Sequence, residues 1–98
     1  YGKTNMVMMR DIKYFESRGR HIIINLVDNQ SIQYVGQLKN EIKKLPLNFV
    51  EIGKSYIINL KHMKECHVSY VVMDDGKELG ISRAYRNYFN EKILEYNS

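Results

Sequence analysis

Apolar and polar residues alternate through the first third of the chain, which is the pattern of half-buried β-strands. Apolar residues at every second position across residues 5–16 predict two short strands around a turn at Arg10-Asp11. Residues 17–21 are polar, with a glycine at the centre, and predict a loop.

Residues 22–27 predict a more deeply buried strand. Three consecutive isoleucines and two further apolar residues are too continuous and too β-branched for a surface helix, so we expect burial on much of both faces. A turn at residues 28–30 and the alternation of Ile32 and Tyr34 indicate a returning strand. These two strands form a hairpin whose other end is the loop at residues 17–21.

A short helix is predicted after Gly36. Leu38, Ile42 and Leu45 fall at positions i, i+4 and i+7, which places them in one apolar stripe, and Pro46 ends the helix. The lysines of this segment lie outside the stripe and are expected on its solvated face: Lys39, Lys43 and Lys44.

Residues 49–60 hold three apolar blocks around a short polar break at Gly53-Lys54-Ser55. Glycine allows a sharp bend of the backbone, and a serine hydroxyl bonds readily to nearby backbone groups. We expect a tight bend between two buried anchors that holds Lys54 in a defined position. The alternative interpretation is an ordinary loop with a solvated lysine.

The last third of the chain predicts a hairpin followed by a helix. Residues 68–73 read as a strand, and residues 74–77 (DDGK) as a turn, because Asp and Gly tolerate positive φ. Ser82 is a suitable N-cap for a helix that starts at Arg83. The arc of this helix expected to face the sheet holds Tyr85, Tyr88, Phe89, Ile93 and Tyr96, and the outward arc holds Arg83, Arg86, Asn87 and Asn90.

These elements predict a mainly β fold, made of small antiparallel sheets of short strands with two short helices. The helices are about forty residues apart and no turn joins them directly, which excludes a helix-turn-helix motif. The sequence contains no repeats, low-complexity tracts or linkers, so we expect residues 1–98 to form a single domain.

Composition narrows the class of protein without deciding its function. The formal net charge is +4 and the hydrophobic fraction is 44%, values that suit a globular protein and admit nucleic acid as a partner. The longest apolar run is only a few residues, so no membrane span is expected. The single cysteine fits a reducing compartment, and we expect a cytoplasmic protein.

Candidate catalytic and metal-binding chemistry is weak. His62, Cys66 and His67 are close in sequence, but a structural zinc site needs four ligands and no cysteine pair is present. We expect Cys66 to be a small core residue. The sequence contains no phosphate loop, nucleophile elbow or HExxH motif. We therefore expect no enzymatic activity, no metal and no cofactor.

Four motifs, in the same order along the chain, resemble the LytTR family, the DNA-binding output domains of bacterial response regulators. Residues 49–60 (FVEIGKSYIINL) are similar to the central family pattern F-x-R-x-H-[RKN]-S-[YF]-[LIV]-V-N, and residues 11–17 (DIKYFES) to its opening D-I-x-Y-[IF]-E-S. Residues 36–38 precede a lysine-rich helix, and residues 80–83 (GISR) resemble the closing [IV]-[PG]-[IV]-S-R. The resemblance covers roughly residues 6–96.

The resemblance implies sequence-specific binding of double-stranded DNA by a transcriptional response regulator that inserts loops into DNA grooves. It also implies a receiver domain upstream in the full-length chain and a homodimer on repeated promoter sites. The chain starts at Tyr1 instead of methionine, so we expect it to be the C-terminal fragment of a longer regulator.

Three connecting segments carry the basic and polar residues that the resemblance implies for DNA contact. Arginine suits bidentate contact with guanine or phosphate, and lysine serves phosphates as a point charge. The expected DNA-binding residues are Arg18, Arg20, His21, Lys54, Ser82, Arg83 and Arg86.

One position departs from the family pattern. The family usually has histidine directly before the [RKN]-S pair, where this chain has Gly53, so a base contact by that histidine is missing here. The alternative to DNA binding is a β-rich protein-interaction module whose exposed tyrosines and basic loops bind an acidic protein partner.

Overall fold

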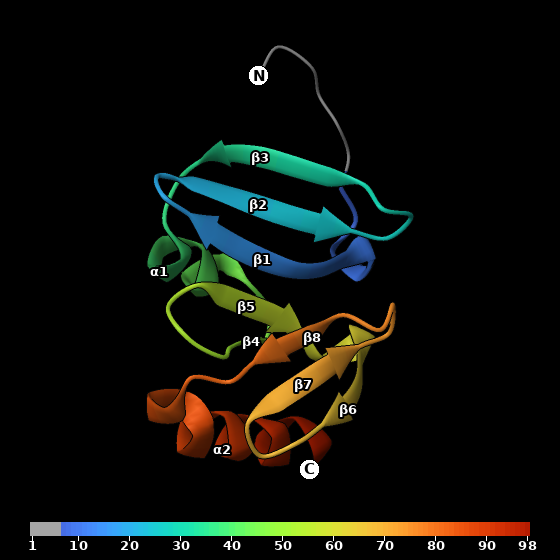
Figure 1. Cartoon of the computed structure of the whole chain (residues 1–98), viewed down its shortest axis with the longest axis vertical. Helices are drawn as coiled ribbons and strands as arrows, with labels where there is room; N and C mark the ends of the chain where they lie inside the picture. The colour runs from blue at the N-terminus through green and yellow to red at the C-terminus, as the bar shows by residue number, and fades with distance from the viewer. Residues whose placement is uncertain (1–6) are drawn as a thin grey trace.

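Two antiparallel β-sheets lie one above the other along the long axis of the molecule, whose extents are 41 × 25 × 23 Å (Figure 1). This computed structural model describes residues 7–98. The five-stranded sheet has the order β3 (Ser31–Val35), β2 (His21–Leu26), β1 (Ile12–Arg18), β5 (Tyr56–Asn59) and β4 (Phe49–Glu51). The three-stranded sheet has the order β6 (Met63–Cys66), β7 (Tyr70–Met73) and β8 (Glu78–Gly80).

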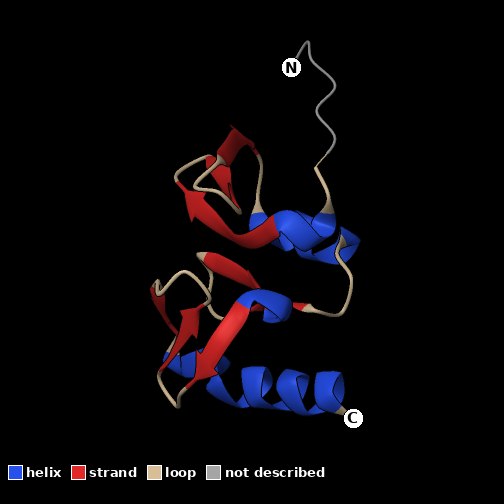
Figure 2. Cartoon of the chain, turned by 90° about the vertical axis from the view of Figure 1, so that its right-hand side faces the viewer, coloured by secondary structure: helices blue, strands red, loops and turns tan. Residues whose placement is uncertain are grey.

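Helical segments pack against both sheets, and the long C-terminal helix lies at the bottom of the molecule in Figure 2. The α-helices are α1 (Leu38–Glu41) and α2 (Arg86–Asn97), and the 3₁₀ turns are η1 (Met9–Asp11), η2 (Ile42–Lys44), η3 (Leu60–His62) and η4 (Arg83–Tyr85). The prediction of a mainly β fold is therefore confirmed. Within residues 7–98, no helix is long and apolar enough to cross a membrane.

The two predicted hairpin turns are confirmed by their backbone geometry. Asp28 and Asn29 both have positive φ, at 62° and 58°, which is the pairing of a type I′ turn between β2 and β3. Gly76 has φ 88° in the turn between β7 and β8. Each turn reverses the chain without disturbing the strand pairing beside it.

The prediction of two strands in residues 5–16 is wrong for the part that the structure describes. Val7 and Met8 are not in a strand, and Met9–Asp11 is the 3₁₀ turn η1 that leads into β1. Residues 5 and 6 lie outside the described residues.

The polar loop predicted at residues 17–21 is shorter than expected. Arg18 pairs with His21 as the last rung between β1 and β2, so only Gly19 and Arg20 form the turn. The φ of Gly19 is +62°, a conformation that glycine adopts without cost, and this allows so short a reversal.

The hydrophobic core has two parts, one on each face of the five-stranded sheet. Strand β5 divides them, because its neighbouring residues Ile57 and Ile58 point to opposite faces and are both fully buried. Ile57 lies in the part covered by α1, with Phe15 and Ile22. Ile58 lies in the part enclosed by the three-stranded sheet and α2, together with Phe89.

Burial corrects two details of the predicted strands. Ile22 is fully buried, but the two isoleucines that follow it are partly exposed, so β2 is less deeply buried than its apolar run predicted. Cys66 was expected in the core and is exposed instead, since it ends the edge strand β6.

The predicted aromatic arc of the final helix faces the core in part, and α2 starts at Arg86 instead of Arg83. Phe89 is fully buried, whereas Tyr96 is 40% exposed near the end of the helix. Ser82 precedes the 3₁₀ turn η4, and its side chain makes no capping hydrogen bond. The backbone carbonyl of Ser82 accepts a hydrogen bond from the Tyr85 N–H at 2.8 Å instead.

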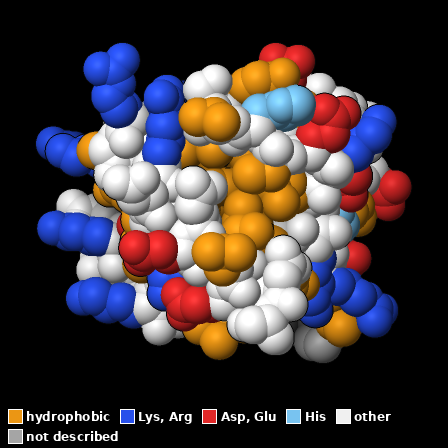
Figure 3. Space-filling model, turned by 90° about the horizontal axis from the view of Figure 1, so that it is seen from below, with side chains coloured by type: hydrophobic (Ala, Val, Ile, Leu, Met, Phe, Trp, Pro, Cys, Tyr) orange, Lys and Arg blue, Asp and Glu red, His pale blue; other side chains and the backbone are white. Residues whose placement is uncertain are grey.

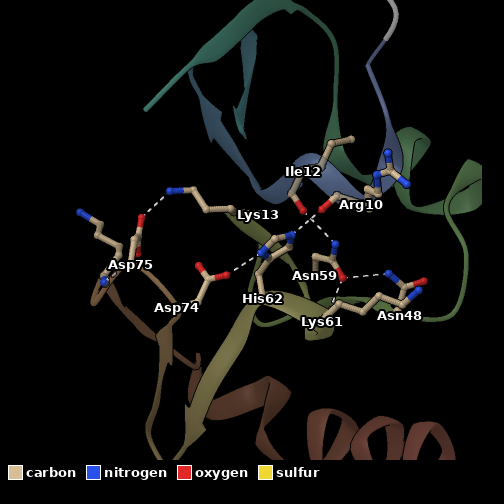
Figure 4. A network of polar contacts seen from close by, with 10 residues as sticks. Arg10, Ile12, Lys13, Asn48, Asn59, Lys61, His62, Asp74 and Asp75 are labelled. Carbon is tan, nitrogen blue, oxygen red and sulfur yellow. Dashed lines mark hydrogen bonds and ion pairs between the residues drawn. The ribbon is translucent and has the colours of Figure 1, made fainter. Parts of the chain in front are cut away.

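A network of polar side chains joins the two sheets at the edge where β1 begins (Figure 4). Lys13, which is only 7% exposed, forms an ion pair with Asp75 in the β7–β8 turn. His62 lies between two acceptors, with Nδ1 2.6 Å from Asp74 Oδ2 and Nε2 2.5 Å from the Arg10 carbonyl. The sheets are thus fixed to each other by charge as well as by the shared core.

The buried amide of Asn59 completes this junction. Its Nδ2 donates to the Ile12 carbonyl at 2.8 Å, and its Oδ1 accepts from Asn48 Nδ2 at 2.8 Å and from the Lys61 N–H at 3.0 Å. A buried polar side chain whose donors and acceptors are used in this way specifies one arrangement of its neighbours. Asn59 therefore ties the end of β5 to the start of β1.

Removing the large side chain at either part of the core should destabilise the domain. We predict that Ile57→Ala and Phe89→Ala each lower the free energy of unfolding by roughly 2–5 kcal/mol, since each leaves a cavity in a fully buried site. Leu94→Ala is the matched control on α2, because Leu94 is 71% exposed. Urea midpoints close to wild type for both core variants would show that the packing assigned to them is wrong.

The contacts of His62 predict a pH-dependent contribution to stability. Partial burial lowers the pKa of His62, but its contacts with the Arg10 carbonyl and the Asp74 carboxylate outweigh this and raise the pKa above 6.5. The protonated ring donates to both acceptors, so its stabilising contribution is complete below about pH 6.5 and is lost as the pH rises through the folded-state pKa.

Urea unfolding between pH 5.5 and 8.5 would measure this contribution. We expect the stability difference between wild type and His62→Gln to shrink as the pH rises through about 6.5 and above. A difference that grows over this range would contradict the assignment of a protonated His62 between two acceptors.

Candidate nucleic-acid interface

Three connecting segments meet along one edge of the molecule, which is the left-hand side of Figure 1. They are the β1–β2 turn, the loop at residues 52–55 between β4 and β5, and the segment where β8 leads into η4. The Ser17 N–H donates to the Ser55 carbonyl at 2.8 Å, and the Ser82 N–H donates to the Ile52 carbonyl at 2.8 Å. The central loop is therefore bonded on one side to β1 and on the other to the start of the final helix.

The central loop has the bend that the sequence predicted. Ile52 is fully buried, and its N–H donates to the Tyr56 carbonyl at 3.2 Å, which closes the loop over residues 53–55. Lys54 and Ser55 are exposed at the tip. Gly53 lies so close to the next segment that a Cβ there would stand 3.3 Å from Ser82 Cβ. The predicted bend between two buried anchors is confirmed, and Lys54 is exposed at its tip.

Each of the three segments presents one exposed cation. Arg20, Lys54 and Arg83 are all exposed, and none of them forms an ion pair with a residue in the described range 7–98. Lysine and arginine side chains gather along this same edge when the molecule is seen from below, on the left of Figure 3. The edge is thus a row of available positive charge.

The remaining candidate residues differ in how far contacts within the protein already occupy their side chains. Arg18 donates to the Glu16 carboxylate at 3.0 Å, which offsets part of its charge. Arg86 is half-buried, and its Nε donates to the Ile81 carbonyl at 3.3 Å, so it also supports the backbone. His21 is exposed in the last rung of the hairpin, beside Arg20. The structure therefore places all seven candidates at this edge or directly beside it, with Arg20, Lys54 and Arg83 the most available.

A hollow of about 480 Å³ beside the central loop was not predicted from the sequence. Its walls include the half-buried rings of Tyr56 and Tyr85, and Lys54 and Ser82 lie at its rim. Burial and the nearby Glu16 carboxylate raise the pKa of Tyr56, and the Arg18 guanidinium opposes this. The periodic pattern indicated Tyr56 only as part of an apolar strand, so nothing in the sequence marked it as part of a surface hollow.

The residues considered for metal binding are dispersed in the part of the chain that the structure describes. Across residues 7–98, no three His, Cys, Asp or Glu side chains lie close enough together to hold a metal ion. His67, which the sequence placed beside Cys66, contacts Glu65 Oε1 at 2.8 Å and stacks on Tyr70 with ring centroids 4.4 Å apart. What the edge offers is positive charge, backbone rigidity and aromatic surface.

A family model described as the LytTr DNA-binding domain matches residues 2–94. The chain belongs to the LytTR family of DNA-binding domains. The resemblance carried by the four sequence motifs is thereby confirmed, and the LytTR family is a DNA-binding one, not a family of enzymes. No curated protein sequence matches this LytTR domain.

Among solved structures, this LytTR domain is similar to one from Bacillus cereus. That structure is described as the LytTr DNA-binding domain of a methyl-accepting/DNA response regulator. The two share 22% sequence identity and a TM-score of 0.80, over 89% of this chain and 84% of the other. The similarity confirms the fold, while the assignment of individual DNA contacts stays a prediction.

Proposed function

We propose that this LytTR domain recognises specific sequences in duplex DNA through the three connecting segments at its basic edge. In this proposal the domain is the output module of a bacterial transcriptional response regulator in the cytoplasm. A receiver domain precedes it in the full-length chain, and two copies bind repeated half-sites in a promoter.

The observation that carries this proposal is the alignment of three exposed cations without ion-pair partners in the described residues. Arg20, Lys54 and Arg83 come from segments far apart in the sequence, yet backbone hydrogen bonds hold those segments side by side. Charges without a protein partner at rigid positions suit contact with an external anion, because little conformational freedom is lost on docking.

The arrangement of the three segments suits the insertion of loops into DNA grooves. The longest extent of the molecule is 41 Å, and the three segments are spread along that axis in Figure 1. A duplex that lies along this edge would meet the three segments one after another, with the central loop bonded to both of its neighbours. Both α-helices lie flat against the sheets, which leaves the connecting segments to enter the grooves.

Binding to duplex DNA should weaken steeply as salt concentration rises. If about four to six phosphates are neutralised, the slope of log K against log salt should be about −4 to −5. Fluorescence anisotropy with a labelled mixed-sequence duplex would measure this slope. A domain that binds an acidic protein partner instead of DNA would show no binding to the duplex at any salt concentration tested.

Recognition of sequence should depend on the two arginines of the outer segments. We predict that Arg20→Ala and Arg83→Ala each reduce the preference for a selected site over a scrambled duplex by about 1–3 kcal/mol. Both side chains are exposed, so each variant should keep its free energy of unfolding within about 0.5 kcal/mol of wild type.

Lys77→Ala is the matched control for charge. Lys77 is exposed in the β7–β8 turn, at the opposite edge of the molecule in Figure 1, so its loss changes net charge equally without touching the proposed interface. Full discrimination by both arginine variants, together with lost discrimination by Lys77→Ala, would place the contact surface on the other edge.

A further inference from the structure

The hollow beside the central loop lies within the basic edge and has an apolar interior. Its floor includes Ile52 and Ile81, which are 0% and 4% exposed, and its sides include Tyr56 and Tyr85. Lys54 stands at one rim. Arg83 is the residue between Ser82 and Ala84, which line the hollow on its other side. An apolar surface thus separates two of the cations expected to contact DNA.

The walls of the hollow are held in place by other aromatic rings. The ring of Tyr56 packs against that of Tyr14 with centroids 6.0 Å apart, and the ring of Tyr85 meets Tyr88 edge-on at 6.2 Å. Each wall is thus packed against a further ring, and packing of this kind lowers the entropic cost of contact with a ligand. A rigid surface of this kind can distinguish ligands by their shape. A flexible side chain would adapt to ligands of several shapes.

We propose that the apolar floor of this hollow is a specificity subsite that contacts the 5-methyl group of a thymine, while the rest of the hollow holds the edge of the base. The inference rests on the proposed DNA-binding function and extends it from charge contacts to a base. In the major groove the thymine methyl is the apolar group that the base edges present, and apolar side chains recognise it by contact. Lys54 binds a flanking phosphate and Arg83 contacts a neighbouring base edge, so that the thymine lies over the hollow.

Gly53 keeps the hollow open. It lines the hollow together with Ser82, and a Cβ at position 53 would stand only 3.3 Å from Ser82 Cβ. This is the position at which the family pattern has histidine, a side chain that would occupy the space. In this proposal, the polar contact that histidine would make with a base is replaced by the apolar contact between the hollow and the thymine methyl.

Replacing thymine by deoxyuridine tests the subsite, because this change removes only the methyl group and keeps the base pairing. A site is first selected from a random duplex pool with the wild-type domain, and each thymine is then replaced in turn. We expect one thymine at which the affinity falls about fourfold, the effect of exposing one buried carbon group.

Two variants connect the effect to the hollow. Gly53→Ala narrows it from the loop side, and Ala84→Leu fills it from the helix side, where the exposed Ala84 leaves the fold undisturbed. With either variant, the duplexes with thymine and deoxyuridine should bind equally well. The second variant provides the test if the first fails to fold.

The outcomes separate this proposal from the function on which it rests. If the wild-type domain selects a sequence but no thymine is sensitive to loss of its methyl group, the subsite is overturned and DNA recognition stands. Undiminished sensitivity in both variants would overturn it as well. If the wild-type domain selects no sequence, both proposals fall.

Discussion

Burial of β5 on both of its faces is the constraint on which the rest of the domain depends. Ile57 and Ile58 point in opposite directions and neither is exposed to solvent, so each needs its own covering layer. The segment containing α1 covers one face, and the three-stranded sheet with α2 covers the other. A chain of this size has room for both layers only because the strands and helices are short, which explains the many brief elements.

The same strand positions the basic edge. The loop that precedes β5 reaches the surface between two neighbours and is hydrogen-bonded to both, through Ser55 on one side and Ile52 on the other. A core buried on two faces leaves little freedom for the loop that enters it. The charge at Lys54 is therefore placed by hydrophobic packing, and its position relative to the neighbouring segments is set by backbone bonds rather than by side-chain contacts.

Local pattern was sufficient to predict the hairpins, the two helices and the bend at Gly53, because each depends on neighbouring residues. Strand β6 could not be predicted, since its four residues show no clear period and at this edge of the sheet only Met63 is even partly buried. Lys13 could not be predicted to be buried, because its partner Asp75 is 62 residues away. The hollow was missed for a similar reason, as its two sides come from separate segments.

The turn at Asp28-Asn29 has a practical consequence for the length of this chain. It lies at the edge opposite the three basic segments in Figure 1, and its two residues are exposed. Exposed tips of this kind tolerate inserted residues, whereas an insertion at residues 52–55 would shift the bonds on both sides of that loop. A reporter inserted at this turn should therefore leave the basic edge intact, whereas one inserted at residues 52–55 should not.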